Sequence, residues 1–159
     1  MSTIRRIINE VKEIISYIES ESLDNHRFIE LKNINDDIYK LEFVFLGPKE
    51  SPYEELVSVI QIDIPKEYPN KAPHMRVKTK MYHPNISQSD GTICLDVLKD
   101  NWRPIYTLRT ILMSIISLLS DPNPDSPLNS DAATMYKNSL KNIKDRREYL
   151  KKIFSHMDH

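Results

Sequence analysis

The sequence predicts an α+β domain: an N-terminal helix, a four-stranded antiparallel meander sheet, an irregular segment and C-terminal helices. Three observations predict this class. Apolar residues recur at helical spacing over residues 3–19, their period changes to two over residues 27–79, and helical spacing returns after residue 107. Residues 80–106 between the two regions have almost no period. A segment of this kind inside a compact domain usually has a function.

The first helix is predicted from one apolar stripe. Its members are Ile4, Ile7, Ile8, Val11, Ile14, Ile15 and Ile18. Ser2 or Thr3 is a suitable cap. The charged residues Arg5, Arg6, Glu10, Lys12 and Glu13 lie off the stripe. The simpler interpretation of these charges is a solvated face, and the alternative is a basic docking surface around Arg5, Arg6 and Lys12.

Four runs of alternating or β-prone residues predict the strands, at 28–32, 39–45, 60–64 and 75–78. Turn-forming residues separate the runs, at 33–37, 47–52 and 65–73. The dipeptides that most strongly favour tight hairpin turns are absent, so no particular turn type is predicted. Short connections between consecutive strands favour antiparallel pairing in sequence order.

The C-terminal third predicts more helices. Apolar residues nearly surround the axis of a helix over 108–119, which Thr107 would cap, so this helix should be buried on most sides or share one side with a partner. The proline-rich stretch 121–127 ends it. A helical tail begins at Ser130, with a break near Asn138. Its expected apolar stripe consists of Tyr136, Leu140, Ile143, Tyr149, Leu150, Ile153 and Phe154.

Composition narrows the function classes. The 159 residues suit a single domain, 1–159, that needs neither disulfides nor metals to be stable. Lys plus Arg (22) nearly balances Asp plus Glu (23), which argues against nucleic acid or membrane as main partners. Two glycines cannot supply a glycine-rich phosphate loop. One cysteine excludes an internal disulfide and a CxxC metal site. We expect a monomer of the cytoplasm or nucleus, with no metal.

Cys94 is the strongest nucleophile candidate. A lone cysteine is more often a buried, inert thiol, but this one lies in the aperiodic segment, where reactive thiols are more common. A hydrolase would need an oriented base, and His83, followed at once by Pro84, is the only histidine nearby. A thiol that only accepts an acyl group and passes it on needs less assistance from neighbouring groups than a hydrolase does. Attack on its thioester creates an oxyanion, for which the Asn85 amide is a suitable donor, although asparagine in a loop is more often a turn former.

Several motifs resemble those of the ubiquitin-conjugating enzymes, over roughly residues 4–154. They are Tyr82-His83-Pro84-Asn85, Gly91-Thr92-Ile93-Cys94-Leu95-Asp96, Trp102-Arg103-Pro104 and the stretch 118–128, preceded by Gly47-Pro48, Ser51-Pro52-Tyr53 and Tyr68-Pro69. The pairing of His-Pro-Asn with Ile-Cys-Leu-Asp is highly specific, whereas each short proline motif alone is not. The family fold is a helix, a four-stranded meander and packed helices.

The resemblance implies a role for each matching residue. Cys94 would accept ubiquitin as a thioester from an activating enzyme, which consumes ATP upstream, so no cofactor is expected here. Asn85 would support the oxyanion or hold the active-site loop, in which His83, Pro84 and Tyr82 would be structural. Donor ubiquitin would contact Leu95, Asp96, Met113, Ser117 and Asn123. Activating enzyme and ligases would dock at Arg5, Lys12, Asn70 and Pro104, before transfer to a substrate protein.

The chain also departs from the family pattern. The segment between Asn85 and Cys94 is one residue longer than usual, which could shift the Asn85 amide. Ser126, which we place with the catalytic residues, stands where many members carry an acid. Asn70 and Ile105 replace an apolar residue and an alanine that are common in ligase-binding members. Two alternatives stay open: a carrier of a ubiquitin-like modifier such as SUMO, and a non-catalytic ubiquitin-binding scaffold. SUMO carriers usually have more than the seven residues found here between Cys94 and Trp102.

Overall fold

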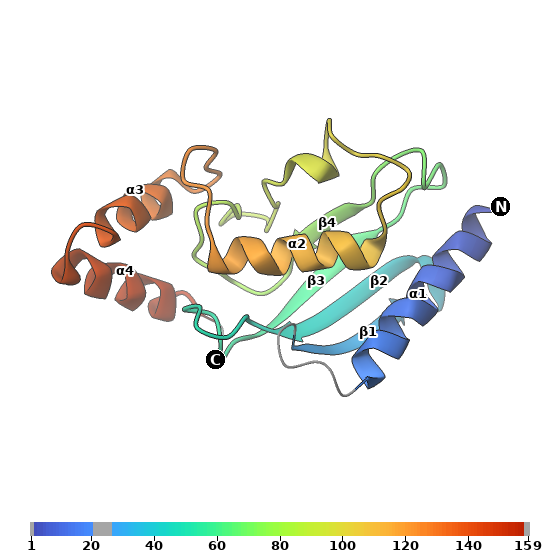
Figure 1. Ribbon diagram of the computed structural model, residues 1–159, viewed down its shortest axis with the longest axis horizontal. Helices are drawn as coiled ribbons and strands as arrows, with labels where there is room; N and C mark the ends of the chain where they lie inside the picture. The colour runs from blue at the N-terminus through green and yellow to red at the C-terminus, as the bar shows by residue number, and fades with distance from the viewer. Residues whose placement is uncertain (1, 21–26, 158–159) are drawn as a thin grey trace.

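The element order of the structure matches the predicted one. A computed structural model describes residues 2–20 and 27–157 (Figure 1). Its helices and strands are α1 (Thr3–Glu19), β1 (Phe28–Ile34), β2 (Asp37–Leu46), β3 (Val57–Asp63), β4 (His74–Val77), α2 (Leu108–Ser120), α3 (Ser130–Ser139) and α4 (Ile143–Ser155). One 3₁₀ turn, Asp96–Leu98, lies in the irregular segment. No helix in the described ranges is long and apolar enough to cross a bilayer.

The sheet is the predicted antiparallel meander, with strands in the order β1-β2-β3-β4. The turn between β1 and β2 is tighter than the sequence indicated. Ile34 pairs with Asp37, so only Asn35 and Asp36 connect the strands, with φ of 54° and 58°. Asn and Asp tolerate positive φ better than other non-glycine residues, and two such residues match the twist of a hairpin. This pair therefore serves as a two-residue turn although it contains no glycine.

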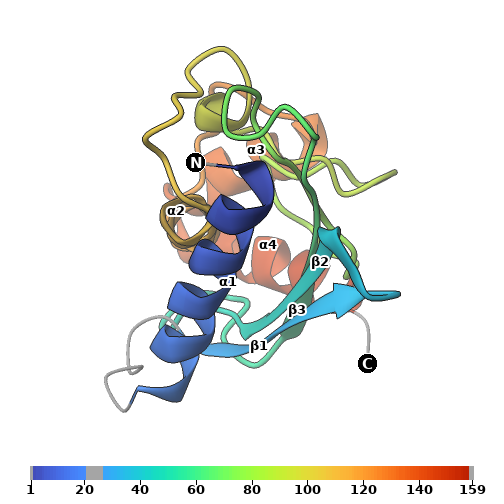
Figure 2. The same ribbon diagram turned by 90° about the vertical axis from the view of Figure 1, so that its right-hand side faces the viewer.

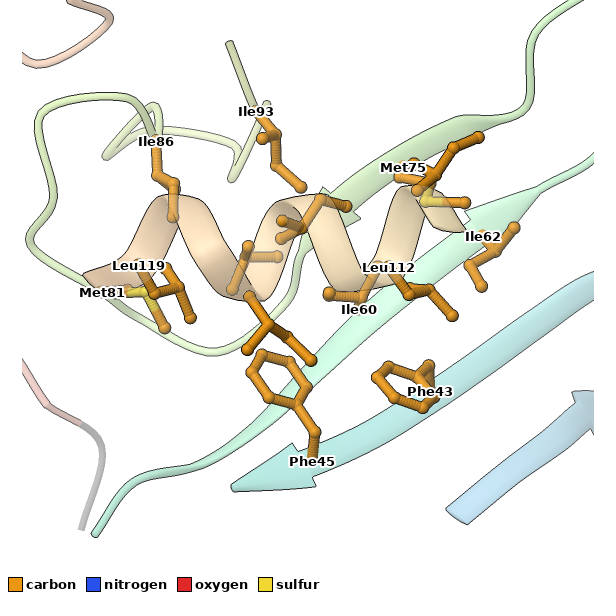
Figure 3. Close-up of a cluster of buried hydrophobic side chains, with 14 of the residues drawn as sticks. Phe43, Phe45, Ile60, Ile62, Met75, Met81, Ile86, Ile93, Leu112 and Leu119 are labelled. Carbon is orange, nitrogen blue, oxygen red and sulfur yellow. The ribbon is translucent and has the colours of Figure 1, made fainter. Parts of the chain in front are cut away.

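Helix α2 crosses one face of the sheet and forms the core with it (Figure 3). Phe43 and Phe45 of β2 and Ile60 of β3 are fully buried there, as is Leu112 of α2. The buried Met81, Ile86 and Ile93 of the irregular segment also belong to this cluster. The helix is apolar nearly all round because the sheet and the irregular segment both pack against it, which confirms the prediction of burial on most sides.

Glu10 corrects the expectation that the charges of α1 form a solvated face. Its side chain is buried and joins three segments. The Tyr68 hydroxyl and Arg6 Nε donate to Glu10 Oε2 over 2.7 and 3.1 Å, and the backbone N–H of Leu108 donates to Oε1 over 2.7 Å. Burial and the neighbouring carboxylate raise the pKa of Tyr68. The carboxylate thus fixes α1 against the start of α2, and Figure 2 shows these helices side by side.

The C-terminal helices break after Ser139, as predicted, but their apolar stripe divides. Tyr149 and Ile153 face the core. Leu140, Ile143 and Phe154 do not, with exposed fractions of 68%, 69% and 49%. The stripe prediction was therefore wrong for these three residues, because α3 and α4 pair with each other and each shows one side to solvent.

Ser58 of β3 yields a stability prediction. Its hydroxyl is the one buried side-chain polar atom in the described ranges without a hydrogen-bond partner. Leaving such a group unpaired costs about 1–3 kcal/mol. We expect Ser58→Ala to raise the free energy of unfolding by about 1 kcal/mol, measured by urea denaturation. The matched variant is Ser51→Ala, which should lower it, because the Ser51 hydroxyl donates to Pro48 O over 2.7 Å. A loss of stability on Ser58→Ala would contradict the prediction.

Candidate active site

Cys94 and Asn85 face each other at the base of a small hairpin in the irregular segment. The N–H of Cys94 donates to the carbonyl of Asn85 over 2.8 Å, and Ile86 bridges to Ile93 above them. The turn closes where the N–H of Gly91 donates to the carbonyl of Ser87 over 2.9 Å. The backbones of Asn85 and Cys94 are thus paired at the base of a hairpin that closes between Ser87 and Gly91.

Gly91 is required where it stands. Its φ is +77°, and a Cβ there would lie 1.9 Å from the carbonyl oxygen of Val77. Its own carbonyl accepts the N–H of Val77 over 2.9 Å, which fixes the hairpin beside β4. Glycine therefore supplies both the left-handed backbone and the close approach to the sheet.

Cys94 is a free cysteine of intermediate exposure, so it is not among the fully buried residues of the core. Leu95, the next residue, packs partly against the core, so the backbone beside the thiol is anchored. Asp96 then begins the 3₁₀ turn with its side chain exposed, and it accepts a hydrogen bond from the Asn101 amide over 2.9 Å. After the thiol, the chain thus continues through an anchored residue into a short turn, of which Asp96 is exposed while Val97 and Leu98 are half-buried.

The Asn85 side chain is buried and fully engaged. Its Nδ2 donates to the carbonyls of Asn123 and Ser126 over 2.7 and 3.1 Å, and its Oδ1 accepts the N–H of Asn123 over 2.8 Å. Of the two roles considered for Asn85, these contacts are those of a side chain that holds the loop. Since both amide hydrogens are in use, donation to an oxyanion requires one of these two bonds to be exchanged.

His83 is buried, and its ring nitrogens have opposite roles. Nδ1 accepts the N–H of Asn85 over 3.0 Å, so Nε2 carries the proton and donates to the carbonyl of Leu118 over 2.9 Å. Burial lowers the pKa of His83 to about 4. With a lowered pKa and both ring nitrogens hydrogen-bonded, His83 has no free nitrogen to act as a general base at neutral pH, and its structural role stays a prediction.

Two neighbours complete the support of this segment. The carbonyl of Pro84 accepts the N–H groups of Leu128 and Asn129 over 2.9 and 3.1 Å. The Tyr82 ring stacks on His156 with 4.9 Å between centroids, and its hydroxyl lies 3.4 Å from the sulfur of Met135. The active-site hairpin is therefore held by the loop 121–128 and by the C-terminal helices together.

The residues predicted to contact donor ubiquitin lie on three segments. Leu95 and Asp96 follow the thiol, and the exposed Asn123 lies in the loop that Asn85 holds. Met113 and Ser117 lie on α2, where Met113 is half-buried and Ser117 is exposed. Ser126 is exposed in the same loop as Asn123, and its carbonyl, not its hydroxyl, contacts Asn85.

The residues predicted for docking lie on three segments: α1, the segment after Tyr68 and the segment after Trp102. Arg5, Lys12, Asn70 and Pro104 are all exposed. Their segments are tied together: Trp102 Nε1 donates to the carbonyl of Pro69 over 2.8 Å, the Arg6 guanidinium to Tyr106 O over 2.7 Å, and the Thr3 hydroxyl to Tyr68 O over 2.8 Å. No local pattern could indicate these links, since each joins residues far apart in the chain.

The residues in ranges 2–20 and 27–157 contain no cluster of His, Cys, Asp and Glu that could hold a metal ion. The site therefore consists of a thiol, a buried amide and the backbone that joins them. A helix, a four-stranded meander and a cysteine-bearing hairpin against the crossing helix define the class, that of ubiquitin-conjugating enzymes. The family profile described as "Ubiquitin-conjugating enzyme" matches residues 6–152, and the chain belongs to this family.

Two curated relatives share much of the sequence. The chain is 39% identical to ubiquitin-conjugating enzyme E2 1 of Schizosaccharomyces pombe over 142 residues, which cover 89% of this chain and 65% of that protein. It is 43% identical to ubiquitin-conjugating enzyme E2 1 of Caenorhabditis elegans over 118 residues, 74% of this chain and 58% of that protein. The chain thus spans less than two thirds of the length of these relatives.

Solved structures share the fold. The ubiquitin-conjugating enzyme Pex4p of H. polymorpha, solved in complex with the soluble domain of Pex22p, superposes with a TM-score of 0.88 at 28% identity, covering 99% of this chain and 97% of that one. A putative ubiquitin-conjugating enzyme of Plasmodium yoelii gives a TM-score of 0.81 at 34% identity, covering 99% and 94%. The E2 domain of a Toxoplasma gondii ubiquitin-conjugating enzyme gives 0.78 at 32%, covering 94% and 92%.

Proposed function

We propose that the chain carries ubiquitin as a thioester on Cys94 and transfers it to a substrate lysine or to a ligase. The observation that carries the proposal is the pairing of the partly exposed Cys94 with Asn85 across the hairpin base, over 2.8 Å. This backbone pairing joins the two residues, and the Asn85 side chain holds the loop that carries Asn123 and Ser126. Family membership supports ubiquitin as the cargo.

Two acyl transfers make up the proposed reaction. In the first, the Cys94 thiolate attacks the C-terminal carbonyl carbon of ubiquitin on the activating enzyme, a C–S bond forms, and the activating enzyme leaves as its thiolate. In the second, a lysine amine attacks that carbonyl carbon, an amide forms, the amine loses a proton, and Cys94 leaves as a thiolate. Because His83 is neutral and occupied, that proton goes to another base or to water.

The proposed partner surfaces follow from the same fold. Donor ubiquitin would rest on α2 and on the loop 121–128, near Met113, Ser117 and Asn123. The activating enzyme and ligases would dock on the segments that carry Arg5, Lys12, Asn70 and Pro104. Ile105, which follows Pro104, is 81% exposed and is the most accessible large apolar residue among those that the structure describes.

A charging assay tests the function. With activating enzyme, ATP and ubiquitin, we expect an adduct on non-reducing gels that a thiol reductant removes. Cys94→Ser should convert it to an adduct that resists the reductant, because an oxygen ester replaces the thioester, and Cys94→Ala should abolish it. SUMO and other modifiers, offered in parallel, test the alternative cargo. An adduct with one of these and none with ubiquitin would favour the second carrier hypothesis, and no adduct with any would favour the scaffold.

A further inference from the structure

The charges of the chain are segregated, although they nearly cancel in total. Residues 130–159 contain seven Lys or Arg and four Asp or Glu, which gives this part a net charge of +3. The whole chain carries −1, so residues 1–129 carry −4. A basic α3–α4 pair therefore projects from an acidic body, and in Figure 1 this pair forms the end of the molecule away from the N-terminus of α1.

The outer side of α4 combines this charge with apolar groups. Ile143, Arg147, Leu150 and Phe154 follow the spacing i, i+4, i+7, i+11, which places them on one side of a helix. The side chains of Ile143 and Phe154 are 69% and 49% exposed, and Leu150 is half-buried. The other side of α4 carries Tyr149 and Ile153, which hold the helix to the core.

Cations surround this apolar stripe. Lys144 and Lys151 are exposed beside it, and Arg147 lies within it. None of these three forms an ion pair with any residue that the structure describes. Glu148 is the one acid exposed on this helix, whereas Asp145 is partly buried and bonds to Asn142, the cap residue. The stripe thus has unpaired positive charge on it and around it.

The α3–α4 turn adds another exposed apolar residue just before α4 begins. Leu140, 68% exposed, lies just before α4, next to the exposed Lys141. We call Leu140, Lys141, Ile143, Lys144, Arg147, Leu150, Lys151 and Phe154 the α4 face. At 1.5 Å per residue, the 13 residues of α4 give it a length of about 20 Å.

We propose that the α4 face binds reversibly to an anionic lipid surface. Helices that lie in a membrane interface carry Lys and Arg around large apolar residues, since the apolar groups enter the acyl boundary while the cations reach lipid headgroups. Protein–protein interfaces are instead depleted of Lys. Four cations among eight residues on a projecting helix therefore favour lipid over a protein partner. The near-zero net charge of the whole chain argued against a membrane as a partner. That total is the sum of a negative charge on residues 1–129 and a positive charge on residues 130–159.

Vesicle co-sedimentation of the full chain tests the proposal. We expect binding to vesicles of phosphatidylcholine mixed with phosphatidylserine, weakened by added salt, and no binding to phosphatidylcholine alone. Each basic residue near such a surface strengthens binding about fivefold, so Lys144→Glu/Lys151→Glu should weaken it by about 30-fold or more. Ile143→Ser/Phe154→Ser keeps every charge and should weaken it by about tenfold or more. Both pairs are exposed, so the urea midpoint should change little.

The matched control is Lys40→Glu/Lys49→Glu, which makes the same charge change on exposed residues elsewhere. It should change binding less than about threefold. Failure to bind the mixed vesicles, equal weakening by the control, or no effect of Ile143→Ser/Phe154→Ser would each overturn the proposal. So would capture of a synthetic acidic Glu/Leu peptide by this face without vesicle binding, which would point to a protein partner. The assay involves no thioester, so its failure leaves the proposed function of Cys94 untouched.

Discussion

Asn85→Ala should slow discharge of the Cys94 thioester to free lysine by about 10²-fold, while the rate of loading falls far less. Loss of the side chain removes the proposed oxyanion donor and also the bonds that hold Asn123 and Ser126. Discharge depends on both, because its transition state carries an oxyanion next to this loop. Single-turnover discharge and charging rates, measured on the same preparations, check the prediction.

The same variant should lower the free energy of unfolding by about 2 kcal/mol, since it leaves the buried N–H of Asn123 and two carbonyls without their partner. Asn101→Ala is the matched control, because its exposed amide makes one bond, to Asp96. It should change stability by less than about 0.5 kcal/mol. Equal slowing of loading and discharge by Asn85→Ala would contradict a special role in transfer, and unchanged unfolding would contradict the loop-holding contacts.

Acid should destabilise the protein through His83. The ring is neutral in the fold with its pKa lowered to about 4, whereas an unfolded histidine titrates near 6.5. Between these values the unfolded chain binds more protons than the folded one, so stability falls as the pH falls. The contribution is fully present above pH 6.5 and decreases by about 1.4 kcal/mol per pH unit below it. By pH 4 the loss is on the order of 3 kcal/mol.

Urea denaturation between pH 7.5 and 4.5 measures this slope, and the exposed His74 provides the control. His74→Gln should keep the contribution of His83 to the slope, and His83→Gln should remove that contribution. Carboxylates that titrate in the same range contribute equally to all three proteins, so the difference between them isolates His83. NMR titration of the ring in the unmodified chain provides a measurement that does not depend on a variant. A His83 ring that titrates near 6.5 would disprove the prediction.

Local periodicity determined most of the fold in advance. The apolar stripe of α1, the alternation in β2 and β3 and the cap at Thr107 are properties of neighbouring residues, so helix, strands and boundaries could be predicted within a few positions. The tight turn at Asn35 and Asp36 was missed because neither residue is glycine, although both tolerate positive φ.

The candidate site was less predictable. Cys94 and Asn85 were found because they lie in a segment without period and match a family motif. The geometry of the site could not be predicted, because Asn85 bonds to Asn123 and Ser126, which lie 38 and 41 positions further along the chain. Likewise, Glu10 looked like a surface charge until Tyr68 and Leu108 were brought to it from distant segments.

The sequence by itself thus determined the order of helices and strands, the family and the nucleophile, because these depend on residue type and on spacing along the chain. Only the tertiary structure decided which groups meet: the amide of Asn85 with the loop 121–128, the neutral ring of His83 with the carbonyl of Leu118, and the outward position of Ile143 and Phe154. The physical reason is that burial and hydrogen bonding depend on packing between distant segments, which no local pattern records.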